Sequence, residues 1–258
     1  MKNQKVSPLY QFIKGTIRLF YPRIQVVGAE NLPSEPAIFV GNHAQLHGPI
    51  ACELYFPVER YTWCAGQMME LKEVPDYAFQ DFWAQKPKSI RWLFRGLSYL
   101  IAPLSVCIFN HAQTIGVYHD SRILSTFKTT VKRLQEGASI VIFPECSQPH
   151  NHIVYQFQEN FIDIAKLYHK RSGKALSFVP LYVAPQLRQL HIGKPIVFDP
   201  DAPIAQERAR ICRELMDAVT ALAESLPLHT VIPYPNIPKK DYPTNIPSKE
   251  EFHETARR

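Results

Sequence analysis

The chain has 258 residues, of which 46% are hydrophobic, and its formal net charge is +6 at pH 7. This length and hydrophobic content favour one main domain with a sizeable core. The 5 cysteines are scattered and lack Cys-x-x-Cys spacing, which argues against a disulfide framework or a zinc ribbon and favours a reducing cytoplasm.

The first predicted element is a basic amphipathic helix at residues 8–21. Its apolar residues fall on one helical face, with Gln11, Lys14 and Arg18 opposite. The positive charge is concentrated here, because no acidic residue precedes Glu30. One interpretation is an interfacial anchor that contacts a membrane surface with anionic headgroups. The other is a helix that packs on the domain and leaves its basic face in water.

The apolar stretches are too short to predict a transmembrane helix. The longest, residues 96–109, has about 14 residues against the roughly 20 that span a bilayer. The N-terminus also lacks the apolar core and small-residue cleavage site of a signal peptide. We therefore expect a cytoplasmic protein that lies peripherally on the inner face of a membrane.

Strand and helix patterns alternate along the rest of the chain. We expect strands at residues 23–27, 37–40, 61–65, 115–118, 139–143, 177–184 and 189–192. Amphipathic helices are expected at residues 121–136, 157–170 and 204–226. This alternation is typical of an α/β domain with a mostly parallel sheet flanked by helices. The domain is expected to cover residues 23–226, after the amphipathic helix within residues 1–22.

Two segments interrupt this alternation. Residues 77–110 are crowded with aromatic and aliphatic side chains, and we expect a hydrophobic helical insert. It lines a pocket for an apolar chain, dips into a bilayer, or forms a buried helical hairpin. Residues 227–258 are rich in proline among charged residues and predict an extended tail without a core of its own.

Polar residues follow two of the apolar strands directly. The strand at residues 37–40 is followed by Asn42 and His43, and the strand at residues 139–143 leads into Glu145. A histidine at the end of a buried strand is typical of an enzyme, since its unperturbed pKa of about 6.5 suits a general base. Two such strand ends imply one shared site, with His43 and Glu145 as candidate catalytic residues.

These segments resemble the motifs of the glycerolphosphate and lysophosphatidate (1-acylglycerol-3-phosphate) acyltransferase superfamily. The first family motif reads Asn-His-x4-Asp; Asn42 and His43 match it, while Gly48 replaces the aspartate. The third reads Phe-Pro-Glu-Gly-Thr-Arg. Here residues 143–148 keep the Phe-Pro-Glu and a hydroxyl at Ser147, with cysteine for glycine and Gln148 for arginine.

The second and fourth family motifs also have counterparts. Residues 114–120 resemble the second motif, with His119 where arginine usually stands, and residues 178–183 resemble the fourth, a strand interrupted by proline. All four segments occur in the family's order and spacing between residues 36 and 200. The resemblance therefore covers most of the expected domain.

The resemblance implies transfer of a fatty acyl group from acyl-CoA or acyl-carrier protein to a lysophospholipid or related hydroxyl or amine acceptor. His43 would be the general base, with no metal or redox cofactor, and the lipid acceptor would be met at a membrane surface. The resemblance favours the anchor interpretation of residues 8–21. The rival interpretation is a catalytically inactive relative that binds a lipid or acyl chain, because the motif aspartate is missing.

Gly48 leaves the support of His43 open. In the family, the aspartate fixes the imidazole tautomer and stabilises the imidazolium, and loss of such support in a serine protease lowers turnover about 10⁴-fold. Glu145, His47 and the Asn42 amide could replace it. Glu145 is the only anion among them, so we expect it to compensate in part.

At three positions where the family has a cationic side chain, this sequence has a neutral or titratable one. His119, Gln148 and Gln158 stand where the family has two arginines and a lysine, which are usual phosphate ligands. We favour an acceptor without a phosphate at that place; the alternative is that Arg122 binds the phosphate. The candidate substrate-binding residues are Asn42, His47, His119, Arg122, Ser147 and Gln148.

Metal and nucleic-acid binding are not expected. His43 and His47 have i, i+4 spacing, and Cys146, His150 and His152 cluster, but no His-Glu-x-x-His signature is present. The Gly48-Pro49 pair also argues against a continuous helix through His47. Cys146 is either a thiol nucleophile or, in the simpler interpretation, a small residue in place of glycine. The sequence has neither a Gly-rich phosphate loop nor an aromatic-basic nucleic-acid surface.

Overall fold

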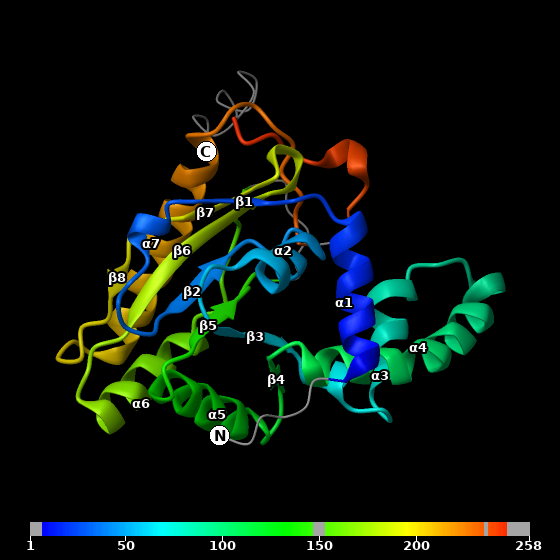
Figure 1. Cartoon of the computed structure of the whole chain (residues 1–258), viewed down its shortest axis with the longest axis horizontal. Helices are drawn as coiled ribbons and strands as arrows, with labels where there is room; N and C mark the ends of the chain where they lie inside the picture. Colours follow the sequence, from blue (N-terminus) through cyan, green and yellow to red (C-terminus); the bar gives the residue numbers. More distant parts are fainter. Residues whose placement is uncertain (1–6, 147–152, 235–236, 247–258) are drawn as a thin grey trace. The chain divides into compact units, whose positions relative to one another are not determined.

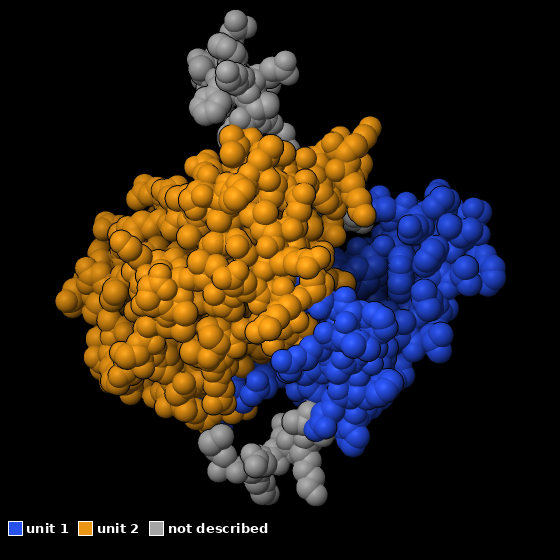
Figure 2. Space-filling view, turned by 45° about the horizontal axis from the view of Figure 1, so that its top comes forward, with its two compact units in different colours: residues 1–21, 61–132 blue, residues 22–60, 133–258 orange. Residues whose placement is uncertain are grey.

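The structure of the protein is a computed structural model that describes residues 7–146, 153–234 and 237–246 (Figure 1). Contacts group the chain into two compact units (Figure 2). Unit 1 comprises residues 1–21 and 61–132, and unit 2 comprises residues 22–60 and 133–258. Each unit contains a hydrophobic cluster of its own.

Unit 2 is built on a mixed, mostly parallel sheet. Its strands lie in the order β1 (Gln25–Val27), β7 (Gln189–Ile192), β6 (Ser177–Ala184), β2 (Ile38–Gly41) and β5 (Ser139–Ile142), and β8 (Ile196–Val197) pairs with β6. β2 lies between β5 and β6 and runs parallel to both. All residues of β2 and β5 are buried, which explains why these strands read as continuous apolar runs.

Helices pack on this sheet. The helices of unit 2 are α2 (His47–Tyr55), α6 (Asp163–Ser172) and α7 (Ile204–Glu224), with 3-10 turns η1 (Ala29–Asn31), η5 (Asn160–Ile162), η6 (Pro185–Leu187) and η7 (Lys239–Asp241). Val219 and Ala223 of α7 pack against Tyr182 of β6. Arg208 of α7 makes a two-bond ion pair with Asp163 at the start of α6. The helices are thereby fixed to one another as well as to the sheet.

Unit 1 combines a parallel strand pair with helices. Its elements are α1 (Pro8–Phe20), β3 (Arg60–Ala65), η2 (Gly66–Met69), α3 (Val74–Ala78), the π-helical turn η3 (Phe79–Trp83), η4 (Lys88–Ile90), α4 (Arg91–His111), β4 (Thr114–Val117) and α5 (Ile123–Gln135). β3 and β4 pair in parallel. Met68, Val74, Ala78 and Ala102 form a buried cluster between η2, α3 and α4.

The predicted fold class is confirmed: a mostly parallel sheet is flanked by helices and an N-terminal helix is present. Each predicted strand appears within two residues of its expected bounds. β8 and α2 were not predicted. α2 begins at His47, so Pro49 lies in its first turn, where a helix needs no donor from the backbone. His43 precedes this helix, and the two histidines therefore do not share a helical face.

The insert contains a longer helix than the apolar run indicated. Residues 88–111 form a helical segment that is long and apolar enough to cross a membrane, by length and composition alone. This corrects the expectation that no segment meets that test. The expectation counted only the uninterrupted apolar run, whereas the helix also includes the residues around Arg91 and Arg95.

The proline-rich segment packs back onto unit 2. His229 and Asn245 are buried, and the Tyr182 hydroxyl lies 2.8 Å from His229 Nε2. The Asn245 amide donates to the Ala223 and Leu226 carbonyl oxygens at the end of α7. The described part of this segment therefore shares the core of unit 2 through polar contacts with α7 and β6.

Candidate active site

His43 and Glu145 lie at the carboxyl ends of adjacent parallel strands of unit 2. His43 follows β2 and Glu145 follows β5. The backbone N–H of His43 donates a hydrogen bond to Glu145 Oε1 at 2.9 Å. In open α/β sheets, ligands bind outside the carboxyl ends of the strands. The structure thus brings the two candidate catalytic residues together at the edge where a ligand is expected.

The Asn42 side chain holds β2 to β6 at this edge. Its Nδ2 donates to the Val183 carbonyl oxygen at 3.0 Å, and its Oδ1 accepts from the Val183 N–H at 2.7 Å. Asn42 is buried. This two-bond contact gives Asn42 a structural role next to His43, and its part in substrate binding stays a prediction.

The loop after His43 is tightly turned. Ala44 and Gln45 have φ angles of 46° and 54°, a left-handed conformation that costs a non-glycine residue about 1 kcal/mol or more. Gly48 N–H donates to the His43 carbonyl oxygen at 2.9 Å, and His47 N–H donates to that of Ala44 at 3.0 Å. These bonds turn the chain from β2 directly into α2 and fix the position of the His43 backbone.

Gly48 is a site of close packing. A Cβ atom there would lie 2.7 Å from the His43 carbonyl oxygen, 2.9 Å from that of Asn42 and 3.0 Å from Phe143 Cε1. Two of these neighbours are backbone atoms, so they cannot move aside without shifting the loop. With this backbone, the aspartate of the family motif has no room, and the glycine is required by the loop itself.

Glu145 does not support His43 in the expected way. Its hydrogen bond is to the His43 backbone, while Nδ1 of the imidazole is buried without a hydrogen-bond partner among the residues that the structure describes. Burial raises the pKa of Glu145 to about 8, although the bond from the His43 N–H opposes the shift. The carboxyl group is therefore mostly protonated near pH 7, which differs from the anion expected from the sequence.

The imidazole of His43 lies in an aromatic environment. The Phe143 ring meets it edge-on at 5.2 Å between centroids, and the Tyr234 ring lies 5.0 Å away at an angle of 52°. Burial lowers the pKa of His43 to about 4, with a small opposing effect from the Gln45 backbone. His43 is therefore a neutral imidazole at physiological pH and can accept a proton.

Sequence reasoning missed the contribution of the proline-rich segment. Tyr234 covers the His43 ring, and the Tyr242 hydroxyl accepts a hydrogen bond of 2.7 Å from Gln45 Nε2 in the loop. The signal was the presence of aromatic residues between prolines in a segment without its own core. Tyrosines in such a segment need apolar partners elsewhere in the chain.

The other candidate residues are distributed over both units. His47 begins α2, and partial burial lowers its pKa. In unit 1, His119 is exposed, while the Arg122 guanidinium binds Glu73 at 2.7 Å and Asp120 at 2.8 Å. Two carboxylates thus already occupy Arg122, which disfavours its use for phosphate. The predictions for Ser147 and Gln148 lie outside the described residues.

Cys146 is disfavoured as a second catalytic group. Burial raises the pKa of the Cys146 thiol, so its reactive thiolate is disfavoured. The backbone of Gln158 donates to the Pro144 carbonyl oxygen at 2.8 Å. Within residues 7–146, 153–234 and 237–246, no three or more His, Cys, Asp or Glu residues are arranged to hold a metal ion.

Comparison with known proteins found similarity among solved structures. No protein-family model matches the chain, and no curated protein matches it significantly. The chain is similar to the crystal structure of the 1-acyl-sn-glycerophosphate (LPA) acyltransferase PlsC from Thermotoga maritima, with 15% sequence identity and a TM-score of 0.49. The match covers 85% of this chain and 80% of that chain. We infer the function of this chain from its own residues.

Gly48→Ala should destabilise unit 2, because the added methyl group meets two backbone carbonyl oxygens. We expect a loss of about 1–3 kcal/mol in the free energy of unfolding, measured by urea titration. Gly15→Ala is the matched control, since a Cβ atom there has no neighbour within 4 Å. Its helix should be unchanged or slightly more stable. Equal stability of the Gly48 variant and the wild type would contradict the close packing.

Glu145→Gln should change how stability depends on pH. Because the native pKa is raised from 4.5 to about 8, the contribution of Glu145 to stability is complete below pH 4.5 and is lost as the pH rises to about 8. Glutamine keeps the acceptor for the His43 N–H and does not titrate. The melting temperature of the variant relative to the wild type should therefore rise from about pH 5 to about pH 8. A constant difference would exclude the buried, protonated carboxyl group.

Proposed function

We propose that this protein is an acyltransferase that moves a fatty acyl group from acyl-CoA or acyl-carrier protein to a lysophospholipid or related hydroxyl or amine acceptor. One observation carries the proposal: the partly buried, neutral imidazole of His43 lies beside Glu145 at the carboxyl edge of a parallel sheet. These two residues also stand at the matching positions of two acyltransferase motifs, Asn-His and Phe-Pro-Glu.

In the proposed reaction, His43 accepts the proton of the acceptor hydroxyl while that oxygen attacks the thioester carbonyl carbon. The new C–O bond forms, the C–S bond breaks, and the leaving thiolate takes the proton from the imidazolium to give free thiol. A pKa of about 4 keeps the imidazole unprotonated but makes it a weak base. A thioester is a more reactive acyl donor than an amide, so a weak base is sufficient.

Aromatic contacts take over part of the role of the missing aspartate. The Phe143 and Tyr234 rings both contact the imidazole, which restricts its orientation. We assign Tyr234 as a positioning residue for His43.

Glu145 acts as a neutral acid in this proposal. Its Oε1 accepts the bond from the His43 backbone, and the proton on the carboxyl group is available for a hydrogen bond to substrate. Buried carboxylic acids that stay protonated near pH 7 serve as donors to developing oxyanions in other enzymes. This role requires no negative charge at position 145.

The contacts of Arg122 support an acceptor without a phosphate at the second motif. Its guanidinium already binds Glu73 and Asp120. A phosphate would have to displace one of these carboxylates. A neutral or zwitterionic lysolipid, or another alcohol or amine, is therefore the acceptor class that we propose.

Membrane contact through residues 8–21 belongs to the same proposal. α1 exposes large apolar residues, Leu9, Phe12, Leu19 and Phe20, and carries Lys14 and Arg18. Such a helix suits the interface of a membrane with anionic headgroups. A peripheral position on the cytoplasmic face would bring the protein to its lipid acceptor.

A catalytically inactive lipid- or acyl-binding protein is the second candidate. The buried Nδ1 of His43, which has no hydrogen-bond partner among the described residues, favours this alternative. An imidazole without a fixed tautomer is a poorer base. The two functions differ in whether acceptor-dependent release of thiol occurs.

His43→Gln should abolish acyl transfer. The wild type is incubated with acyl-CoA and a panel of lysolipid, alcohol and amine acceptors, and the free thiol of CoA is followed. We expect acceptor-dependent thiol release that the variant lowers by about 10²–10⁴-fold. His169→Gln, a change on the surface of α6, is the control and should retain full activity. Thiol release that persists in the His43 variant would refute His43 as the general base. Absence of thiol release with every acceptor would favour the lipid-binding alternative.

The pH dependence of kcat/KM tests whether the Tyr234 ring shields His43 from water. For the wild type, the acid limb of kcat/KM should lie below about pH 5, because it reports the His43 pKa of about 4. Tyr234→Leu opens the imidazole to water and should move this acid limb, and the His43 pKa measured by NMR, towards about 6.5. Tyr234→Phe keeps the ring and should leave both unchanged. A merely structural role for Tyr234 would alter stability without moving the pKa.

A further inference from the structure

Helix α4 buries small side chains and exposes large apolar ones, which is the reverse of a helix in a water-soluble domain. Its buried residues are small, namely Ser98, Ala102 and Ser105. Its exposed face carries large apolar side chains, which we call the apolar stripe: Trp92, Leu93, Leu97, Leu100 and Leu104. Trp92 is 74% and Leu100 77% exposed. Water-soluble helices bury their apolar face, so this surface is suited to a non-aqueous environment.

The buried face of α4 is fully used inside unit 1. Ser105 Oγ donates to the Met68 carbonyl oxygen at 3.0 Å, and Ala102 packs in a buried cluster with Met68, Val74 and Ala78. Small residues allow a helix to approach its neighbours closely, which is a feature of helix packing in membranes. The stripe therefore cannot be turned inward without breaking these contacts.

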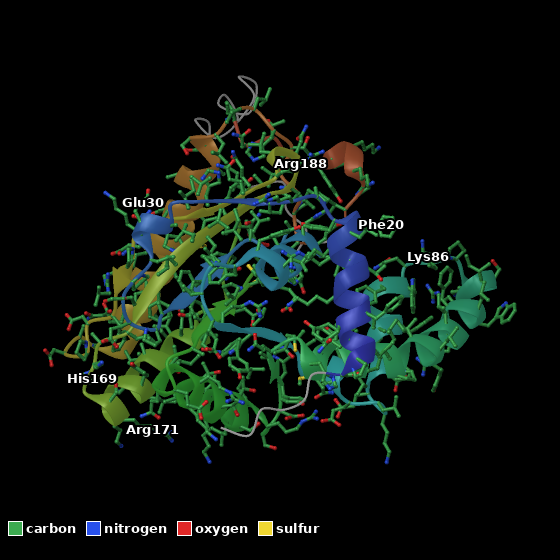
Figure 3. All side chains as sticks on the ribbon, in the orientation of Figure 1. Phe20, Glu30, Lys86, His169, Arg171 and Arg188 are labelled. Carbon is green, nitrogen blue, oxygen red and sulfur yellow. The ribbon has the colours of Figure 1, made fainter. Side chains whose placement is uncertain are left out.

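Within the segment that carries the stripe, the charged residues are all basic. No acidic residue lies between Asp81 and Asp120, while Lys86, Lys88, Arg91 and Arg95 are concentrated at the start of α4. Figure 3 labels Lys86 on the connection that leads into α4. Arg95 is paired with Asp76, and the neighbouring cations extend the basic region. Lipid headgroups with negative charge complement this arrangement.

α1 continues the same surface properties within unit 1. Tyr10 of α1 stacks on His111 at the end of α4, with 6.2 Å between ring centroids, and Cys107 Sγ lies 3.8 Å from Ser7 Oγ. The side chain of Phe20, labelled in Figure 3, projects from the end of α1. Both helices thus present apolar and basic residues from one packed unit.

A spanning orientation does not fit these contacts. The carboxyl half of α4 is tied to η2 through Ser105 and through Asn110, whose amide donates to the Met69 carbonyl oxygen at 3.1 Å. A helix that crossed the bilayer would draw these polar connections into the hydrocarbon, where unsatisfied backbone groups are excluded. An orientation in the plane of the interface leaves the attached elements in water.

We propose that unit 1 binds a lipid bilayer through the apolar stripe of α4. The helix axis lies in the interface, the stripe faces the acyl chains, and the cations at residues 86–95 contact anionic headgroups. This surface deepens the proposed function by naming where the membrane is met, but binding through it requires no catalytic step.

The test measures binding of the full chain to vesicles by sedimentation. Vesicles of phosphatidylcholine mixed with phosphatidylglycerol should pellet the wild type, and vesicles of phosphatidylcholine alone should pellet less of it. Leu100→Glu should lower the partition coefficient about tenfold or more, because a charge replaces a leucine that enters the bilayer in the bound state. Leu228→Glu is the matched control, since Leu228 is 66% exposed on unit 2, and should bind as the wild type does.

The fluorescence of Trp92 reports how deeply the apolar stripe enters the bilayer. Lipids that carry a nitroxide on the acyl chain should quench tryptophan fluorescence of the wild type, and Trp92→Phe should lose this quenching. Circular dichroism checks that the variants are folded; their changed side chains are exposed. Absence of wild-type binding, or equal binding by Leu100→Glu, would overturn the proposal.

Two further measurements separate membrane binding from acyl transfer and from self-association. His43→Gln should bind vesicles as the wild type does, so a failure of acyl transfer and a failure of membrane binding are observed independently. Size-exclusion chromatography tests the other occupant of the stripe, a second copy of the chain. A wild-type dimer that Leu100→Glu converts to a monomer, without vesicle binding by either, would assign the stripe to self-association and overturn the proposal.

Discussion

Side-chain hydrogen bonds at the carboxyl ends of β2, β5 and β6 determine the geometry of the site. The Asn42 amide joins β2 to β6, and the Glu145 carboxyl group joins the residue after β2 to the residue after β5. Backbone pairing between the strands has ended at these positions, so the side chains continue it. The position of the His43 backbone is consequently set from both sides of its strand. The Phe143 and Tyr234 rings contact an imidazole whose backbone position is fixed in this way.

Burial disfavours the charged forms of both His43 and Glu145. The same desolvation lowers the pKa of His43 to about 4 and raises that of Glu145 to about 8. Both groups are therefore predominantly neutral near pH 7, and no ion pair forms between them. The acyltransferase family motif places an aspartate beside its histidine, whereas here Gly48 packs against the backbone and aromatic rings border the imidazole. At this position the chain has close packing and aromatic contacts and no acidic side chain.

The sequence predicted those elements whose pattern is local. Strands β2 and β5 were recognised because they are buried on both faces, and the polar residues that follow them were expected to meet because parallel strands end at one edge. Gly48 could not be interpreted in the same way, since its role depends on the distance to the His43 and Asn42 carbonyl oxygens. Tyr234 comes from a distant segment without periodicity. For α4, the sequence indicated an apolar helix, but only the packing of Ser98 and Ser105 identifies which face is covered.

The contacts of Tyr234 with the His43 ring and of Tyr242 with Gln45 have a consequence for biosynthesis. Chains emerge from the ribosome in order from the N-terminus, and the strands β2, β5 and β6 are complete well before these tyrosines. A nascent chain can therefore assemble the sheet while the imidazole still lacks its aromatic cover. The site reaches its final electrostatic state only when Tyr234 and Tyr242 have been translated and have made these contacts. Maturation of the site is thereby coupled to a late step of chain synthesis, after the sheet that supports it.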